Sequence, residues 1–422
     1  MELIKHSVKS TLYNMRQYLK WLFFGALTGL VTGLVAAAFS YCLEWATNMR
    51  TAHPFQFLLL PLGGLVIVFL YKALHYENSH GTDSIIESIH SRITIPLRMA
   101  FLIFVSTVIT IFCGGSVGRE SAALQIGASF GKSLGDLFHF DERDKKIILM
   151  SGMAAAFSAL FGTPMTASFF AMEVSSVGIM YYAALVPCIC AALVARQTAL
   201  FLGVQTDVFR APASLPLSLP SGLRVVFLAA CCAGVSILFC LMLQLAHELM
   251  AHFFRNLYLR IVCGGVLLIL LTLLVGSQNY LGTGMNIIEE ALTGQALPWA
   301  FFLKMLFTSI TIAAGFKGGE IVPSLFIGAT FGCFLAPFIG LPASLGAAIG
   351  MVSLFCGVTN CPVASLLIAF ELFGFPDAYY FLIAVATSYM LSGYFSLYHA
   401  QRIAYSKFEN RFIDRQTSNW FS

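Results

Sequence analysis

Residues 114–132 read GGSVGRESAALQIGASFGK and place an ionisable Arg119-Glu120 pair between two long apolar stretches. A charged side chain inside a bilayer costs roughly 2.5–3.5 kcal/mol even on insertion scales, so a glutamate here indicates a functional site. The simpler interpretation is a charge at the start of a helix at the membrane surface, where the helix dipole favours a carboxylate. Both interpretations stay open on this stretch alone.

The stretch recurs about two hundred residues later, where 318–332 read GGEIVPSLFIGATFG. Aligning the Ile-Gly pairs of the two stretches also aligns Gly118 with Gly319. Two further pairs of blocks follow the same order: Gly81-Thr82 with Gly282-Thr283, and Pro164 to Glu173 with Pro362 to Glu371. Repeated halves whose apolar segments are broken by glycine or proline at matching places predict a transporter with its binding site at the repeat interface.

Composition places the chain among polytopic, all-α membrane proteins. It is 58% hydrophobic and 10% charged, whereas a soluble domain carries about 25% charged residues. Basic residues flank both ends of the apolar region: Lys5, Lys9, Arg16 and Lys20 before it, and Arg402, Lys407, Arg411 and Arg415 after it. By the positive-inside rule, both ends are expected to be cytoplasmic and the number of crossings even. We expect no cleavable signal peptide, because the first apolar run is long enough to span.

The apolar runs and their breaks predict five regions. These are an amphipathic cytoplasmic segment (1–20), a first transmembrane repeat (21–204), a polar, proline-rich linker (205–221), a second repeat (222–405) and a cytoplasmic tail (406–422). Many apolar pieces are too short to cross a bilayer alone, so broken and tilted helices are expected. The eleven cysteines lack metal-ligand spacing and predict neither a metal site nor disulfides.

Glycines that precede a helix start have a physical use. Exposed N–H groups and the positive end of the helix dipole favour an anion, and glycine lets the ion approach the backbone. GGSVGRE and FKGGEIVP both fit this description, and inverted halves would bring the two helix starts together inside the membrane. The pattern predicts transport of a small anion, although cation transporters also use broken helices, with carbonyl ends facing the ion.

Four motifs resemble the CLC family of anion channels and proton-coupled antiporters. They are GRES at 118–121, GEIVP at 319–323, the proline-to-glutamate block at 164–173 and the tyrosine of SLYHAQ at 396–401. The resemblance covers about residues 20 to 405 and implies a CLC-type fold of two inverted repeats in a homodimer with one anion pathway per subunit. It also implies that Glu120 takes the place of the gating glutamate and Tyr398 that of the anion-coordinating tyrosine.

Departures from the chloride-handling members are equally informative. Residues 80–85 read HGTDSI where those members have Gly-Ser-Gly-Ile-Pro, and Val174 stands where chloride exchangers carry an inner proton-transfer carboxylate. Glu320 replaces an apolar residue. This combination is similar to the fluoride/proton antiporter branch of the family, except that Val322 stands where we would expect a hydroxyl residue.

The resemblance implies fluoride export in exchange for protons, in a bacterial inner membrane, with Glu120 and Glu320 as gating and proton-coupling residues. Desolvation and like-charge repulsion would favour their protonated forms. The alternative is a chloride channel or chloride/proton exchanger of the same family, and no cofactor is expected. The predicted anion-binding residues are Gly81, Thr82, Gly118, Arg119, Ser121, Gly319, Ile321, Val322 and Tyr398. A tyrosine at the end of a membrane segment can also serve simply as an interfacial anchor.

Other classes of protein are possible in principle. GGSVG at 114–118 matches the Gly-x-Ser-x-Gly nucleophile elbow of hydrolases, but that motif needs a strand-turn-helix, a histidine and an acid. A membrane scaffold without transport activity would leave the paired glutamates unexplained. Glu173 and Glu371 are expected to be structural carboxylates at helix ends or interfaces.

Overall fold

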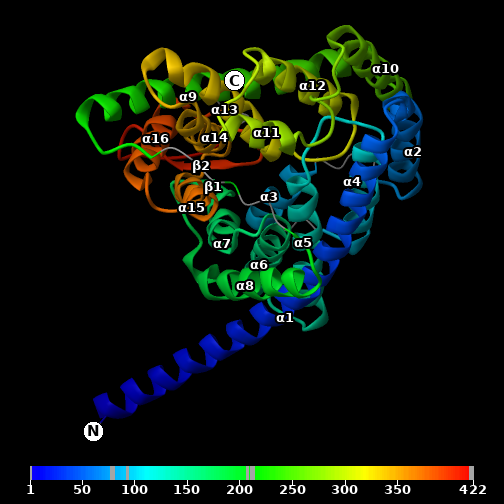
Figure 1. The fold of residues 1–422 in the computed structure, drawn as a ribbon. Helices are drawn as coiled ribbons and strands as arrows, with labels where there is room; N and C mark the ends of the chain where they lie inside the picture. The colour runs from blue at the N-terminus through cyan, green and yellow to red at the C-terminus, as the bar shows by residue number, and fades with distance from the viewer. Residues whose placement is uncertain (1, 77–80, 92–94, 206–208, 210–213, 418–422) are drawn as a thin grey trace.

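The computed structural model of the chain describes residues 2–76, 81–91, 95–205, 209 and 214–417, and it is mostly helical (Figure 1). In the described part, eight α-helices of the first half are followed by eight of the second half. Six helical segments in this part are long and apolar enough to cross a membrane, and several others are shorter. The prediction of an all-α, polytopic membrane protein is therefore confirmed.

The two halves repeat one another element by element. The first half comprises α1 (Glu2–Ala52), α2 (Leu60–Ala73), α3 (Thr82–His90), α4 (Leu97–Phe112), α5 (Glu120–Leu137), α6 (Glu142–Phe161), α7 (Pro164–Glu173) and α8 (Leu185–Phe201). The second comprises α9 (Leu219–Phe253), α10 (Leu257–Val275), α11 (Met285–Leu292), α12 (Ala300–Ala314), α13 (Ile321–Leu335), α14 (Ala343–Thr359), α15 (Pro362–Phe373) and α16 (Ala378–Leu391). Single 3₁₀ turns lie at Gln56–Leu59, Tyr182–Ala184 and Ala336–Ile339.

The predicted linker lies between the halves, but α9 already begins at Leu219. Residues 206–208 and 210–213 of that linker lie outside the described residues, as do residues 418–422 of the predicted tail. The amphipathic segment predicted for residues 1–20 is not a separate helix, because α1 is continuous from Glu2 to Ala52. In Figure 1 the start of α1 projects beyond the helical body.

Helix breaks occur where glycine, asparagine and proline predict them. Gly162 ends α6 with a φ of 73°, and Asn360 ends α14 with a φ of 57°, both in the left-handed region. Glycine adopts this conformation without strain and asparagine tolerates it. Pro164 and Pro362 then open α7 and α15, at the helix position where a missing N–H does no harm. The two breaks are equivalent positions of the repeat.

The short helices α7 and α15 cap one another across the two halves. Glu371, in α15, accepts hydrogen bonds from the backbone N–H groups of Met165 (2.7 Å) and Thr166 (2.8 Å), and from the Thr166 hydroxyl (2.6 Å). Glu173, at the end of α7, accepts from the N–H groups of Val363 (3.2 Å) and Ala364 (3.0 Å) at the start of α15. Each helix start thus receives its acceptor from the other half, in agreement with a structural role for both glutamates.

Close helix packing explains the glycines that follow the two motif stretches. A Cβ on Gly127 of α5 would lie 2.1 Å from the carbonyl oxygen of Gly152 in α6. In the second half, a Cβ on Gly328 of α13 would lie 2.4 Å from the carbonyl oxygen of Gly350 in α14. Only glycine permits backbones to approach this closely, as is common where membrane helices pack.

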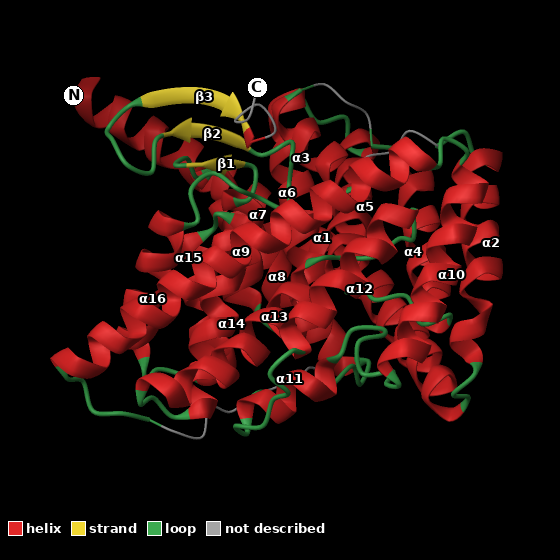
Figure 2. Cartoon of the chain, turned by 90° about the horizontal axis from the view of Figure 1, so that it is seen from above, coloured by secondary structure: helices red, strands yellow, loops and turns green. Residues whose placement is uncertain are grey.

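A small sheet was not predicted from the sequence. β1 (Ser176–Val177) pairs in parallel with β2 (Arg402–Tyr405), which pairs antiparallel with β3 (Phe412–Gln416). The sheet therefore joins the segment after α7 to the segment after α16. In Figure 2 the sheet, α3 and the start of α1 lie along one edge of the molecule, and α11 lies toward the opposite edge.

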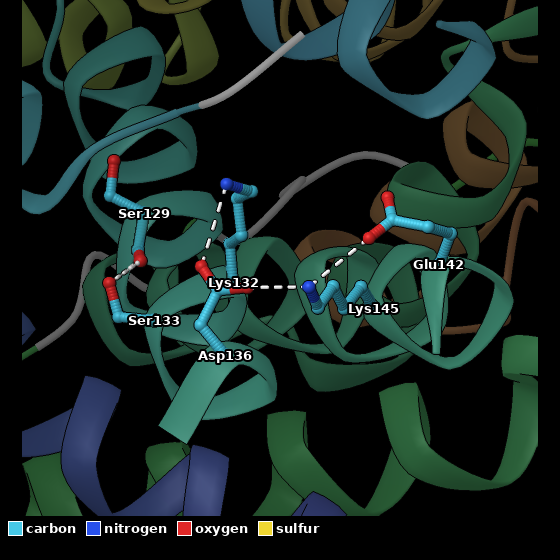
Figure 3. A network of polar contacts seen from close by, with 6 residues as sticks. All are labelled: Ser129, Lys132, Ser133, Asp136, Glu142 and Lys145. Atoms are coloured by element: carbon cyan, nitrogen blue, oxygen red, sulfur yellow. Dashed lines mark hydrogen bonds and ion pairs between the residues drawn. The ribbon is translucent and has the colours of Figure 1, made fainter. Parts of the chain in front are cut away.

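The charged stretch between residues 133 and 150 is mostly helical. Its ion pairs join the end of α5 to the start of α6 (Figure 3). Asp136 lies between Lys132 (3.5 Å) and Lys145 (2.8 Å), and Lys145 also contacts Glu142 (3.1 Å). Such partly exposed pairs contribute little stability individually, so this patch is a connection rather than a site.

Candidate functional site

The two glycine-rich stretches meet backbone to backbone. Gly118 donates its N–H to the carbonyl of Gly319 (2.7 Å), and Gly319 donates to the carbonyl of Gly118 (2.9 Å). This antiparallel bridge immediately precedes the starts of α5 and α13. It brings the first N–H groups of both helices to one place, and helix N-termini carry the partial positive charge that attracts anions.

Glu120, the first residue of α5, occupies this place itself. Its side chain is fully buried, and one carboxylate oxygen accepts a hydrogen bond from the N–H of Val322 in the first turn of α13. The N–H groups of Arg119 and Glu120 also stabilise the carboxylate. The other oxygen, Oε2, has no hydrogen-bond partner among the described residues. The carboxylate therefore sits where the two helix starts would hold a small anion.

A second carboxylate makes the mirror-image contact. Glu320 precedes α13 as its N-cap residue, and its Oε2 accepts a hydrogen bond from the hydroxyl of Ser121 in the first turn of α5 (3.0 Å). Glu120 and Glu320 also act on one another electrostatically. Each half thus contributes one glutamate, and each glutamate is bonded to the first turn of the other half's helix.

The start of α3 and the loop after α16 complete the site. Gly81 has a φ of 61° and is the N-cap of α3; Thr82 follows it and accepts a long hydrogen bond from Gln125 of α5 (3.5 Å). Tyr398 is 2% exposed, and its hydroxyl has no hydrogen-bond partner in the described part of the chain. The charges of Glu120 and Glu320 both act on this phenol, so it lies within their electrostatic reach.

Three of the predicted anion-binding residues make contacts other than those that their side chains led us to expect. Arg119 is the N-cap of α5, but its guanidinium donates to the carbonyl of Leu160 (3.4 Å) and lies over the ring of Phe161 at the end of α6. Ile321 and Val322 are buried, and Val322 stands where the family resemblance led us to expect a hydroxyl residue. Because Val322 makes its contact through the backbone N–H, the lack of a hydroxyl does not remove that contact.

Sequence reasoning missed two polar neighbours of the site. Gln125, one turn after Ser121 on the same face of α5, links that helix to Thr82. Asp83 accepts a hydrogen bond from the N–H of Ala400 (3.0 Å), which joins α3 to the tyrosine loop. The signal available for Gln125 was a polar residue at helical spacing from Ser121 in an otherwise small, apolar run.

It also missed a buried cation. Lys304 of α12 is fully buried and donates to the carbonyls of Tyr280 (3.2 Å) and Gly282 (2.7 Å). Gly282 belongs to the block that repeats Gly81-Thr82, and the charge of Lys304 acts on Glu120. In the second half, therefore, the loop that corresponds to the Gly81-Thr82 loop of the candidate site is held by a lysine.

The hydrolase interpretation does not fit the geometry around Ser116. This serine lies between α4 and α5 rather than between a strand and a helix, and its hydroxyl pairs with that of Thr308 (3.1 Å). A nucleophile elbow needs a strand-turn-helix and a histidine base in reach. The Gly-x-Ser-x-Gly match is thus a coincidence of a glycine-rich approach to a helix.

Comparison with known proteins agrees with this geometry. Residues 63–393 match the family model described as voltage gated chloride channel. The chain belongs to this family. It is 36% identical over 398 residues to the chloride/fluoride channel protein of Pseudomonas syringae pv. tomato, covering 92% of this chain and 87% of that protein. It is 23% identical over 394 residues to an H⁺/Cl⁻ exchange transporter of Vibrio vulnificus, covering 83% and 81%.

Solved structures of other CLC proteins superpose on the chain. A crystal structure of a CLC-type fluoride/proton antiporter has a TM-score of 0.88 and 32% identity, over 91% of this chain and 98% of that one. A slow cyanobacterial chloride/proton antiporter has a TM-score of 0.75 at 18% identity, over 88% and 94%, which shows the common fold. The CLC-type fold expected from the motifs is confirmed.

Proposed function

We propose that this CLC protein exports fluoride in exchange for protons. The observation that carries the proposal is the crossed pair of glutamates, in which Glu120 and Glu320 each contact the first turn of the opposite half's helix. The similarity to a solved fluoride/proton antiporter and to a chloride/fluoride channel protein supports the choice of ion. A protein with the shared chloride machinery alone would have no use for Glu320.

Glu120 acts as the gate. When ionised, its carboxylate takes the hydrogen bond of the Val322 N–H and fills the anion position at the meeting of α5 and α13. Protonation removes the negative charge, and with it the charge-assisted part of that hydrogen bond. The side chain then leaves the helix starts, whose N–H groups bind the incoming anion. The same movement carries the proton, which couples the two fluxes.

Glu320 accounts for a preference for fluoride. When protonated it becomes a hydrogen-bond donor, and Ser121 beside it supplies a hydroxyl. Fluoride is a compact and strong acceptor, so short donors of this kind stabilise it more than they stabilise chloride. Tyr398, whose buried hydroxyl has no protein partner in the described residues, supplies a further donor.

The protein is expected to work as a homodimer in a bacterial inner membrane, with one anion pathway per subunit and both ends cytoplasmic. The relative in Pseudomonas syringae supports the bacterial setting, and the start of α1 on the same edge as the sheet and α3 (Figure 2) supports chain ends on one side of the membrane. The second candidate function is chloride conduction or chloride/proton exchange, which the exchange transporter of Vibrio vulnificus exemplifies.

The test is anion efflux from liposomes that contain the purified protein and are loaded with fluoride or chloride, with internal pH recorded simultaneously. We expect fluoride efflux with proton uptake, much weaker chloride efflux, and loss of coupled exchange in Glu120→Gln. Chloride efflux equal to or faster than fluoride efflux would overturn the fluoride assignment. Fluoride efflux without proton movement would leave a channel instead of an antiporter.

A further inference from the structure

Tyr398 lies in a loop, so hydrogen bonds to other segments are needed to fix the position of its side chain. The loop runs from the end of α16 at Leu391 to the start of β2 at Arg402. Leu397 donates its N–H to the carbonyl of Val358 in α14 (2.9 Å), which fixes one side of the tyrosine. The N–H of Ala400 donates to Asp83, as described above, and fixes the other side. Within the loop, the Tyr398 N–H donates to the Ser396 hydroxyl (3.1 Å), and the Tyr398 carbonyl accepts from the Gln401 N–H (3.2 Å).

Gln401 joins this loop to both halves of the protein. It is fully buried, and its amide donates to the carbonyls of Val174 (2.9 Å) and Thr359 (2.8 Å), at the ends of α7 and α14. Its own oxygen accepts from the Asn360 amide (3.0 Å). A buried amide with every group paired is rigid, because any movement leaves polar atoms unsatisfied. The loop is therefore anchored three residues after the tyrosine.

Thr417 holds the tyrosine peptide from the C-terminal side. Its hydroxyl donates to the carbonyl of Tyr398 (2.7 Å) with the carbonyl of His399 also in reach (3.2 Å), and its N–H donates to the carbonyl of Gln401 (3.0 Å). Thr417 directly follows β3, which pairs with β2. The hairpin of residues 402–417 thus leaves the tyrosine loop, turns, and brings its last residue back onto that loop.

The turn of this hairpin is fastened to the membrane helices. Lys407 is largely buried and donates to the side-chain oxygen of Asn360 (2.5 Å) and to the carbonyl of Tyr389 in α16 (2.9 Å). Cations are favoured where helix carbonyls converge at a C-terminus. The C-terminal hairpin is consequently held in a fixed position across the ends of α14 and α16.

A small cavity borders the tyrosine loop on one side. This cavity of about 70 Å³ lies between α9, at Cys240 and Gln244, and the chain at residues 394–399, and Thr417 forms part of its wall. Loop residues on both sides of Tyr398 line this cavity, whereas Tyr398 itself packs in the hydrophobic core. The hydrogen bonds of Thr417 to Tyr398 and Gln401 oppose a shift of the loop toward the cavity.

We propose that the C-terminal hairpin, residues 402–417, is a clamp that positions Tyr398 in the anion pathway, with Thr417 and Gln401 as positioning residues. The inference rests on the proposed function, because it assumes that the Tyr398 hydroxyl contacts the transported anion. That hydroxyl makes no hydrogen bond to the described part of the protein, so its position follows from the packing of the ring and from the backbone that carries it. A segment outside the membrane helices thereby sets the geometry of the pathway.

Thr417→Val tests the clamp, since valine has nearly the same shape as threonine and lacks the hydroxyl. A hydrogen bond of ordinary strength corresponds to a two- to tenfold effect, so we expect fluoride turnover in liposomes to fall by about that factor. Thr417→Ser should restore it. The matched control is Thr387→Val, which removes a hydroxyl that, among the described residues, donates to the Ile383 carbonyl within α16, and it should transport like the native protein.

Combination with Tyr398→Phe separates positioning from general destabilisation. If Thr417 acts through Tyr398, the double variant Thr417→Val/Tyr398→Phe should be no slower than Tyr398→Phe alone. Independent, multiplying losses would overturn the clamp. A second measurement is hydrogen–deuterium exchange, in which Thr417→Val should speed exchange at residues 397–401 and leave α5 and α13 unchanged. Unaltered exchange in the loop would also overturn the proposal.

The same set of variants distinguishes failure of the clamp from failure of the proposed function. If Tyr398→Phe transports fluoride at the native rate, the anion-binding role of the tyrosine is wrong whatever Thr417 does. If Tyr398→Phe is slow and a folded Thr417→Val is native-like, the clamp is wrong and the transport proposal stands. Should the valine variant misfold, Thr417→Ala gives the same comparison without demanding space.

Discussion

At the scale of single residues, the position of the Glu120 carboxylate at the starts of α5 and α13 depends on the absence of a side chain at Gly118. A Cβ on Gly118 would lie 2.1 Å from Oε1 and 2.3 Å from Oε2 of Glu120. Gly118→Ala should therefore fold, since the end of a glutamate side chain can move, but the carboxylate can no longer sit over the start of α13. We expect faster anion efflux with weaker proton coupling, measured in liposomes with simultaneous pH recording.

Gly234→Ala is the control for this prediction. Gly234 lies in α9, and a Cβ there would meet nothing within 4 Å. Alanine favours helix over glycine by up to about 1 kcal/mol, so this variant should be as stable as the native protein or slightly more. Tightly coupled transport by Gly118→Ala, equal to that of the control, would contradict the gating position of Glu120.

Glu320 is the residue whose change should separate fluoride from chloride transport. Glu320→Gln keeps the shape but removes the exchangeable proton, and Ser121→Ala removes only the hydroxyl that donates to it. Loss of one charged hydrogen bond corresponds to roughly tenfold or more in rate, so we expect at least that loss of fluoride/proton exchange in Glu320→Gln and a smaller loss in Ser121→Ala. Residual chloride efflux should change little. Equal losses for both anions would contradict a specific role in fluoride transport.

At the scale of elements, the crossed caps of α7 and α15 predict an order of stabilities. Glu371 satisfies three donors at the start of α7, whereas Glu173 satisfies two at the start of α15. A buried donor left without an acceptor costs about 1–3 kcal/mol and a partly exposed one less, so the number of donors that lose their acceptor sets the order. Glu371→Ala should therefore lower the unfolding temperature in detergent more than Glu173→Ala does.

The exposed Glu248 of α9 serves as the control, because its contact is a surface hydrogen bond from Gln244. Glu248→Ala should shift the unfolding temperature little. Thermal melts of the purified variants, followed by size-exclusion chromatography, measure all three. A Glu371→Ala variant as stable as Glu248→Ala would show that water replaces the cap.

At the scale of the whole molecule, the stability of the folded protein depends on pH through Lys407, which holds the C-terminal hairpin against the ends of α14 and α16. Burial lowers the pKa of Lys407 to about 8, whereas an exposed lysine titrates near 10.5. Between these values the unfolded chain binds the proton more tightly than the folded protein, so this residue makes the folded state more stable as pH rises. Lys407→Met should flatten the rise of unfolding temperature between pH 8 and 10.5. An identical rise in both proteins would contradict the low pKa.

Much of the fold could be predicted because the sequence contains the same pattern in two repeats. The repeated blocks at Gly118 and Gly319 predicted two equivalent helix starts, and Pro164 and Pro362 predicted the breaks. These signals are local, since glycine and proline act on the backbone where they stand. The expectation that Gly118 and Gly319 lie side by side followed from the assumption that the two halves have inverted topology.

What could not be predicted depends on partners far away in the sequence. β1 has only two residues and no periodic pattern, and its register with β2 is fixed by the packing around it. Nor did the sequence indicate that Glu371 caps α7 rather than its own helix, or that Val322 contributes only its N–H. Side-chain type alone does not reveal which backbone group a distant residue will meet.

The crossed caps also bear on how the protein is made. The ribosome completes the first half before Glu371 has been synthesised, so the start of α7 enters the membrane without its acceptor. That helix start becomes satisfied only when α15 arrives, and α15 in turn needs Glu173, which is already in place. The second half therefore docks onto a carboxylate that is already in place, and the first half reaches its final state only in that docking step.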